Sequence, residues 1–181
     1  MRKVVYIGFF FLLLTASCKK SNNPVLSGSY TINNFLSGSG PYYAMGFSVT
    51  SGETVSTLKS PLDVITINAD FDVNYNVRKI YFATDNFSNS FYRYGIYPDP
   101  TTTGVAFNNL TSFTEPASWK ETGDSVKVNQ IWIYRTSSSG FAKLKITGTV
   151  AEKRDTKPYA YAECTFEWVY QPDGTYTFPK K

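Results

Sequence analysis

The sequence predicts an all-β fold, either an antiparallel sandwich or a half-barrel, that ends in a three-strand meander. Short runs of β-branched and aromatic residues recur along the chain, with turn-forming residues about every eight to twelve positions. No window shows an apolar helical stripe over three turns. The chain has 181 residues, including 14 Tyr, 14 Phe and 3 Trp, and we expect most of these rings in a core. This length indicates one domain, which we place at residues 29–181.

The meander is predicted in residues 126–178. A Ser/Gly turn at 136–140 joins two runs of strand length, and a third run closes on Pro172-Asp173-Gly174. One face of the second run carries Ala142, Leu144, Ile146 and Val150, and one face of the third carries Ala160, Ala162, Cys164, Phe166, Trp168 and Tyr170. A period of two with one apolar face is typical of a half-buried strand.

The charges on the opposite face predict a register for these two strands. If Lys143 lies opposite Glu167, then Leu144 lies opposite Phe166, and both apolar faces point the same way. Cys164 belongs to the apolar face, so we interpret it as a small buried hydrophobe and not as a reactive thiol.

Shorter segments precede the meander. Strands are expected at residues 28–35, 42–49, 54–59, 64–69, 77–84 and 91–97. Residues 98–104 are expected to form a loop because of their Pro, Asp and Gly content. Residues 105–123 show no clear period, and we expect a long ordered loop there with one short helical turn at most.

The N-terminus has the pattern of a secretory signal. Met1-Arg2-Lys3 is followed by an apolar run at 4–14, which is too short to span a bilayer, and then by Thr15-Ala16-Ser17-Cys18. These four residues resemble a bacterial lipobox, which predicts a signal peptide at 1–17, acylation of Cys18 and a flexible tether over 18–28. The alternative is an ordinary signal peptide with an incidental cysteine. Lys19, rather than an acidic residue, favours transfer of the lipoprotein to the outer membrane.

The composition excludes several kinds of chemistry. Removal of residues 1–17 takes away Arg2 and Lys3 and leaves 16 basic and 14 acidic residues, so a net charge of +2 gives no case for nucleic-acid binding. The chain has no His, which removes the usual general base and the commonest metal ligand. We expect no catalytic residues, no metal site and no enzymatic activity.

Four segments resemble, in the same order, those of the HmuY-like lipoproteins, a haemophore-type family of Bacteroidetes outer membranes. They are Phe47-Ser48-Val49-Thr50-Ser51-Gly52-Glu53, then Phe71-Asp72-Val73, then Ile131 to Ile146, and finally Thr165 to Gly174. Together they extend over most of the mature chain. One departure is Phe71, because the family usually has Trp at that position.

The resemblance implies a β-rich fold that captures haem or another flat apolar ligand and passes it to a TonB-dependent outer-membrane transporter. Family members hold haem through His or Met side chains, and this divergent chain has no His. Candidate ligand-binding residues are therefore Met45, Tyr92, Tyr94, Tyr97 and Trp119, chosen by residue type. The alternative is a surface lipoprotein that has lost haem binding and acts in protein or glycan contact.

Overall fold

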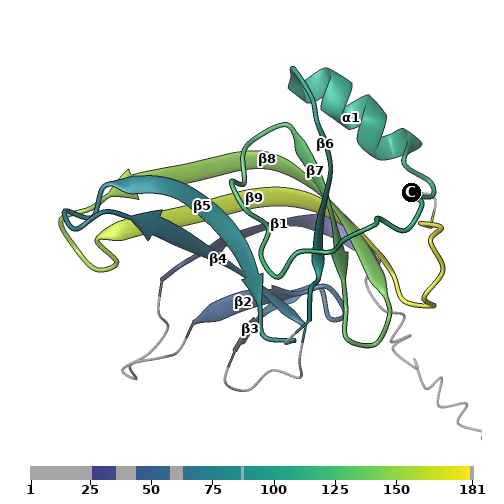
Figure 1. Ribbon diagram of the computed structural model, residues 1–181, viewed down its shortest axis with the longest axis horizontal. Helices are drawn as coiled ribbons and strands as arrows, with labels where there is room; N and C mark the ends of the chain where they lie inside the picture. Colours follow the sequence, from purple (N-terminus) through teal and green to yellow (C-terminus); the bar gives the residue numbers. More distant parts are fainter. Residues whose placement is uncertain (1–25, 36–43, 58–62, 87, 180–181) are drawn as a thin grey trace, which may run out of the picture.

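The protein is a sandwich of two antiparallel sheets, which confirms the predicted all-β class (Figure 1). The computed structural model describes residues 26–35, 44–57, 63–86 and 88–179. One sheet has the order β1 (Ser27–Asn33), β9 (Ala160–Gln171), β8 (Phe141–Lys153), β7 (Gln130–Arg135) and β6 (Phe91–Ile96). The other has the order β3 (Glu53–Ser56), β2 (Met45–Ser48), β4 (Val64–Phe71) and β5 (Val77–Thr84). The predicted signal peptide and Cys18 lie outside the described residues.

The meander β7–β8–β9 is present, but the predicted register of β8 and β9 is wrong by two residues. Lys145, not Lys143, lies opposite Glu167, and Ile146 lies opposite Phe166. The Lys145 Nζ and Glu167 Oε1 atoms are 2.7 Å apart. Charge pairing could not separate the two registers, because both lysines lie on the same face of β8. A β-bulge between Ile146 and Gly148 then shifts the ladder by a further residue.

The loop expected at residues 98–104 is helical from Pro100 onward, and the helix α1 (Pro100–Asn109) also includes residues 105–109 of the long loop expected at 105–123. Asp99 caps it, since its carboxylate accepts hydrogen bonds from the Thr102 backbone N–H and hydroxyl, each at 2.8 Å. Pro100 fits the first turn because its missing N–H would be unpaired there anyway. The apolar stripe is absent because only Thr103 and Phe107 are buried, so the cap and proline are the signals that identify this helix.

The first core lies between the sheets and takes the predicted apolar face of β9. Cys164, Phe166 and Trp168 are buried there together with Phe47 of β2, which confirms the interpretation of Cys164 as a core residue. The Phe47 ring lies 5.3 Å from Phe166 and 5.2 Å from Trp168, both in edge-to-face geometry.

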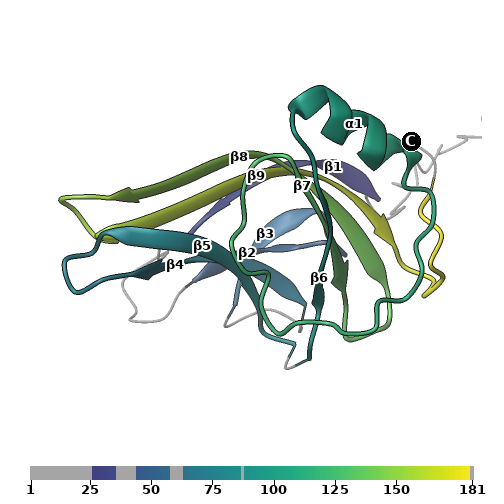
Figure 2. The same cartoon turned by 45° about the horizontal axis from the view of Figure 1, so that its top comes forward.

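Figure 2 shows α1 over the opposite face of the larger sheet. A second core lies on that face. It consists of Phe107, Leu110, Phe113, Trp119, Ile131, Ile133, Phe141, Val169 and Phe178. Lys143 points into this face from β8 and is only 4% exposed. The larger sheet is therefore buried on both faces along much of its length.

The long ordered loop expected at 105–123 instead spans residues 110–129, and it connects the edges of the two sheets. Lys120 forms an antiparallel bridge with Phe91 of β6, and Gly123 forms one with Phe82 of β5. The Val126 N–H donates to the Ile80 carbonyl at 2.9 Å. A Cβ at Gly123 would lie 3.0 Å from Phe82 Cβ, so glycine permits this close approach.

Candidate ligand groove beside β6

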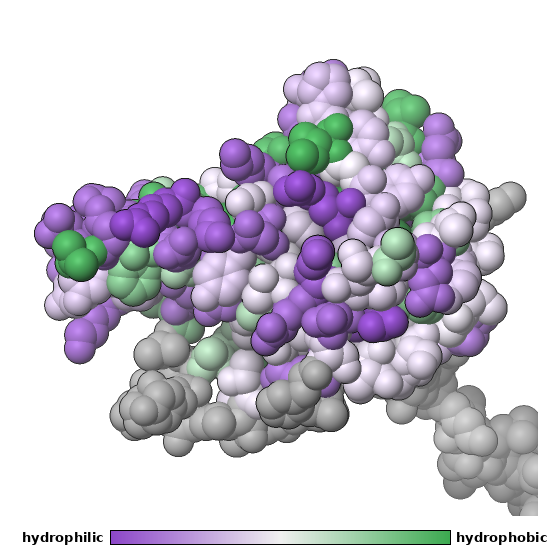
Figure 3. Space-filling view, viewed as in Figure 1, coloured by the Kyte–Doolittle hydropathy of each residue, from purple (hydrophilic) through white to green (hydrophobic). Residues whose placement is uncertain are grey.

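A groove of about 450 Å³ lies between β6 and the connecting loop. Its lining residues are Tyr92, Arg93, Ser118, Lys120, Glu121, Thr122, Asp124 and Trp132. The loop leaves β6 after the Lys120–Phe91 bridge and joins β5 at Gly123, and this divergence opens the groove. Its volume lies in the range of small-molecule sites, roughly 300–1,000 Å³. Hydrophilic residues gather over the middle of this side of the molecule (Figure 3).

Aromatic rings in fixed positions form one part of the groove. The Trp132 indole N–H donates to Gln130 Oε1 at 2.9 Å, which holds the ring in place. The Arg93 guanidinium lies over the Trp132 ring, 5.7 Å from its centroid. Tyr92 packs edge-to-face on Trp119 at a centroid distance of 6.2 Å. Trp132 is only 3% exposed and lies beneath Arg93, so Tyr92 is the half-buried ring that the groove offers to a ligand.

Charged groups of both signs form the rest of the lining. Asp124 forms an ion pair with Lys79 of β5, with Oδ1 and Nζ 2.7 Å apart. The hydrogen bond from Lys79 lowers the pKa of Asp124, and the same hydrogen bond raises the pKa of Lys79. Both groups are therefore charged at neutral pH. Arg93, Lys120 and Glu121 add two cations and one anion, so the groove itself carries two charges of each sign.

The structure brings together two of the five residues predicted to bind a ligand. Tyr92 lines the groove, and Trp119 supports it from the second core. Tyr94 lies within β6 and Tyr97 follows its last residue, and neither lines the groove. Burial raises the pKa of Tyr97. Met45 belongs to β2, in the smaller sheet, where it pairs with Ser56.

Sequence reasoning missed Arg93, Asp124 and Trp132 as groove residues. Arg93 and Trp132 are opposite one another in the β6–β7 ladder, and the register shift after Arg93 marks an irregular strand. This irregularity leaves no sequence signature apart from Gly95. A Cβ at Gly95 would lie 2.7 Å from the Tyr97 hydroxyl, so only glycine leaves room for that ring.

The groove beside β6 offers Tyr92 as a side chain that could ligate haem iron. Haem iron takes an axial His, Cys thiolate, Met or Tyr, and the chain has no His. Cys164 is fully buried between the sheets, and burial raises the pKa of its thiol, which disfavours the thiolate. Tyr92 has the right chemistry, but the charged groups around it would lose water against an apolar porphyrin face.

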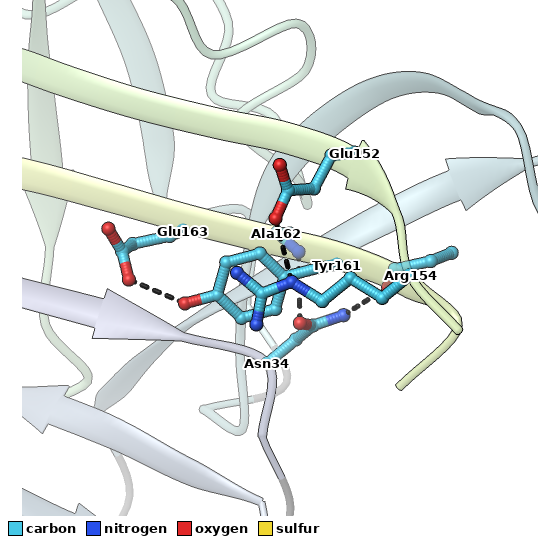
Figure 4. A network of polar contacts seen from close by, with 7 residues as sticks. Asn34, Glu152, Arg154, Tyr161, Ala162 and Glu163 are labelled. Carbon is cyan, nitrogen blue, oxygen red and sulfur yellow. Dashed lines mark hydrogen bonds and ion pairs between the residues drawn. The ribbon is translucent and has the colours of Figure 1, made fainter. Parts of the chain in front are cut away.

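A polar cluster at the far end of β8 and β9 has a structural role (Figure 4). Asn34 donates to the Ala160 carbonyl and accepts from the Ala162 N–H, each at 2.9 Å, which fixes the end of β1 on β9. The Arg154 guanidinium lies over the Tyr161 ring, and its Nε is 2.7 Å from Glu152 Oε1. These groups satisfy one another and leave no evident place for a ligand.

A second polar cluster is buried where three loops meet. The Asp63 carboxylate accepts from Asn86 Nδ2 at 2.9 Å and from the Ser137 N–H and hydroxyl, each at 2.6 Å. These residues precede β4, follow β5 and follow β7, so Asp63 joins both sheets. We assign it a structural role.

Two further features of the described chain bear on function. No helix in residues 26–179, as far as they are described, is long and apolar enough to cross a membrane. Within the same residues, no group of three or more His, Cys, Asp or Glu side chains is placed to hold a metal ion.

The comparisons with known proteins identify no relative of this chain. No family model matches it, and neither a curated protein nor a solved structure matches it. The resemblance to HmuY-like lipoproteins stays a prediction, and the groove beside β6 is the feature that indicates a ligand.

Proposed function

We propose that this protein is a non-enzymatic binding lipoprotein of the bacterial outer membrane that holds a glycan in the groove beside β6. The observation that carries the proposal is the lining, in which the half-buried Tyr92 ring lies among charged and hydroxyl side chains. Sugar rings present C–H faces that stack on aromatic side chains, and their hydroxyl groups both donate and accept hydrogen bonds. A glycan therefore matches both parts of the groove.

The charge of the groove narrows the class of glycan. The groove has two cations and two anions, and Lys79 adds a cation that pairs with Asp124, so a strongly anionic or cationic polymer would meet repulsion as well as attraction. A neutral, hydroxyl-rich ligand uses both signs, because carboxylates accept from hydroxyl groups and cationic groups donate to them.

Titration calorimetry tests this function with the mature protein, residues 18–181, in detergent micelles. We expect neutral oligosaccharides to bind and Lys120→Ala to weaken binding by about tenfold, which corresponds to about 1.4 kcal/mol. Lys127→Ala is the matched control, because Lys127 is also exposed but does not line the groove. Equal losses in the two variants, or no binding of any neutral glycan, would contradict the proposal.

Ferric haem tests the other class of ligand that the resemblance implies. The groove offers one tyrosine among charged groups, so we expect no shift of the Soret band at micromolar protein. A Soret shift that Tyr92→Phe abolishes would instead support the haemophore-type function.

The membrane anchor is part of the same proposal. Acylation of Cys18 would attach the chain to a membrane through lipid and leave the tether before β1 free to extend. Metabolic labelling with a palmitate analogue tests it, and the chain provides its own control because it has two cysteines. We expect Cys18→Ser to lose the label and Cys164→Ser to keep it.

A further inference from the structure

A second hollow lies next to the groove, on the β5 side of the connecting loop. It measures about 390 Å³, and its lining residues are Ala69, Asp70, Phe71, Lys79, Tyr81, Thr122 and Asp124. Thr122 and Asp124 also line the groove beside β6, so the two hollows share a wall. One surface therefore runs from β4 and β5 across the loop to β6.

The charges at the shared wall are paired, so they do not prevent a neutral ligand from extending across it. Asp124 on the loop and Lys79 on β5 neutralise one another through their ion pair of 2.7 Å. Asp70 lies opposite Lys79 in the β4–β5 ladder and adds a second carboxylate to the same hollow. Hydrogen-bond donors and acceptors are therefore present on each side of the wall and at the wall itself.

Each hollow also has at least one aromatic residue that is not fully buried. Tyr81 of β5 and Phe71 of β4 line the second hollow, and Tyr92 of β6 lines the first. Tyr81 and Tyr92 are half-buried, and Phe71 is 45% exposed. The surface thus repeats one pattern twice, an aromatic ring beside charged and hydroxyl groups, with Thr122 and Asp124 between the two copies.

We propose that the two hollows bind successive parts of one neutral, linear oligosaccharide. A polymer of repeated units matches a surface that repeats its own chemistry, and a short sugar can occupy one hollow only. The free energies of the two contacts combine when one molecule makes both, so a longer chain binds more tightly. This inference rests on the proposed function and adds that the ligand is a chain long enough to cross the shared wall.

The experiment compares chain lengths on the mature protein in detergent micelles. The probes are the disaccharides and hexasaccharides of the cello-, malto-, manno- and xylo- series, titrated by calorimetry. For the series that binds, we expect the hexasaccharide to bind at least about tenfold more tightly than the disaccharide. Tyr81→Ala should remove this advantage and leave the disaccharide affinity unchanged, whereas Tyr81→Phe, which keeps the ring, should retain most of it.

The outcomes separate the inference from the proposed function. Equal affinities for the two lengths, or a Tyr81→Ala variant that keeps the full advantage of the hexasaccharide, overturn the extended site and leave the glycan groove in place. A lack of binding by both lengths in all four series overturns the proposed function and the inference together. The unchanged disaccharide affinity of Tyr81→Ala serves as the check that this variant is folded.

Discussion

The two faces of the larger sheet are buried in different ways. The inner face packs on the strands of the smaller sheet, and its buried residues occupy alternate positions along β8 and β9. The outer face packs on α1, on parts of the 110–129 loop and on the C-terminal segment around Phe178, which have no common period. Burial of the inner face can be predicted from the alternation of apolar and polar residues along the strands. Burial of the outer face depends on where irregular segments pack on the sheet.

Lys143 illustrates the difference. On an outer face open to water it would be an ordinary surface lysine, but α1 covers it. Its Nζ donates to the carbonyls of Phe107 and Leu110 at 2.7 and 2.8 Å, and it lies 4.6 Å from the Phe107 ring centroid. These carbonyls belong to the C-terminal end of α1, where unpaired carbonyls and the helix dipole favour a cation. The lysine thus attaches the helix to the sheet.

The largest effect is expected from a cavity in the inner core. Phe47 is fully buried, so Phe47→Ala should reduce the free energy of unfolding by about 3–5 kcal/mol, measured by urea denaturation. Val73→Ala is the control, because Val73 is 93% exposed and should change stability by less than about 0.5 kcal/mol. If Phe47→Ala does not fold, Phe47→Leu leaves a smaller cavity and allows the measurement. A loss below about 1 kcal/mol in both Phe47 variants would mean that this core is not packed as described.

The next effect distinguishes the outer core from an ordinary surface. Lys143→Met keeps most of the length of the side chain but removes the hydrogen bonds that Nζ donates to the Phe107 and Leu110 carbonyls, so we expect a loss of about 2–3 kcal/mol. Lys127→Met replaces an exposed lysine and should be nearly neutral. Urea denaturation of the two variants measures the difference. Equal stabilities would show that α1 does not need this lysine.

The sequence predicts the regular part of the fold well for a physical reason. Strands that pack on a second sheet must alternate. The expected segment at 77–84 coincides with β5, the one at 91–97 contains β6, and the one at 64–69 covers all of β4 except its last two residues. The helix α1 was missed because it buries only Thr103 and Phe107, so the cap at Asp99 is a stronger signal than periodicity.

The groove was harder to predict than the sheets. Tyr92 could be selected by residue type, whereas Asp124 enters the groove only because the 110–129 loop crosses from β6 to β5. That crossing depends on backbone bridges at Lys120 and Gly123, which are long-range in sequence. Residue type therefore identified the Tyr92 ring as a groove residue. The charged residues around Tyr92 could be assigned to the groove only from the tertiary structure.

Two tryptophans allow a finer comparison of the cores. The Trp132 N–H is bonded to Gln130 on the inner side, whereas the buried Trp119 N–H on the outer side has no hydrogen-bond partner among the described residues. Both substitutions to Phe remove similar volume, so Trp132→Phe should cost about 1 kcal/mol more than Trp119→Phe, because it also removes one of the two hydrogen bonds that Gln130 Oε1 accepts, the other coming from the Lys127 N–H. Thermal or urea unfolding of the two variants measures this difference. The opposite order would indicate that the Trp119 N–H is bonded in solution.

The smallest effect concerns the cap of α1 and depends on pH. Hydrogen bonds from the Thr102 N–H and hydroxyl lower the pKa of Asp99 below its ordinary value of 3.8. Because the folded pKa is the lower one, the unfolded chain binds the proton more readily, and the stability that the carboxylate contributes is present above pH 3.8 and disappears as the pH falls through the folded pKa.

Asp72 and Asp173 also have lowered pKa values, so wild-type acid unfolding alone cannot isolate the cap. Asp99→Asn does so, since it keeps an acceptor for Thr102 and removes the titrating group. Between pH 5 and 7, about one to three units above the ordinary carboxyl pKa, we expect the urea midpoint of the wild type to exceed that of Asp99→Asn by a constant amount. Below the ordinary carboxyl pKa, we expect the two midpoints to converge. A constant difference down to pH 2, about two units below that pKa, would mean that the amide differs from the carboxylate in packing and not in charge.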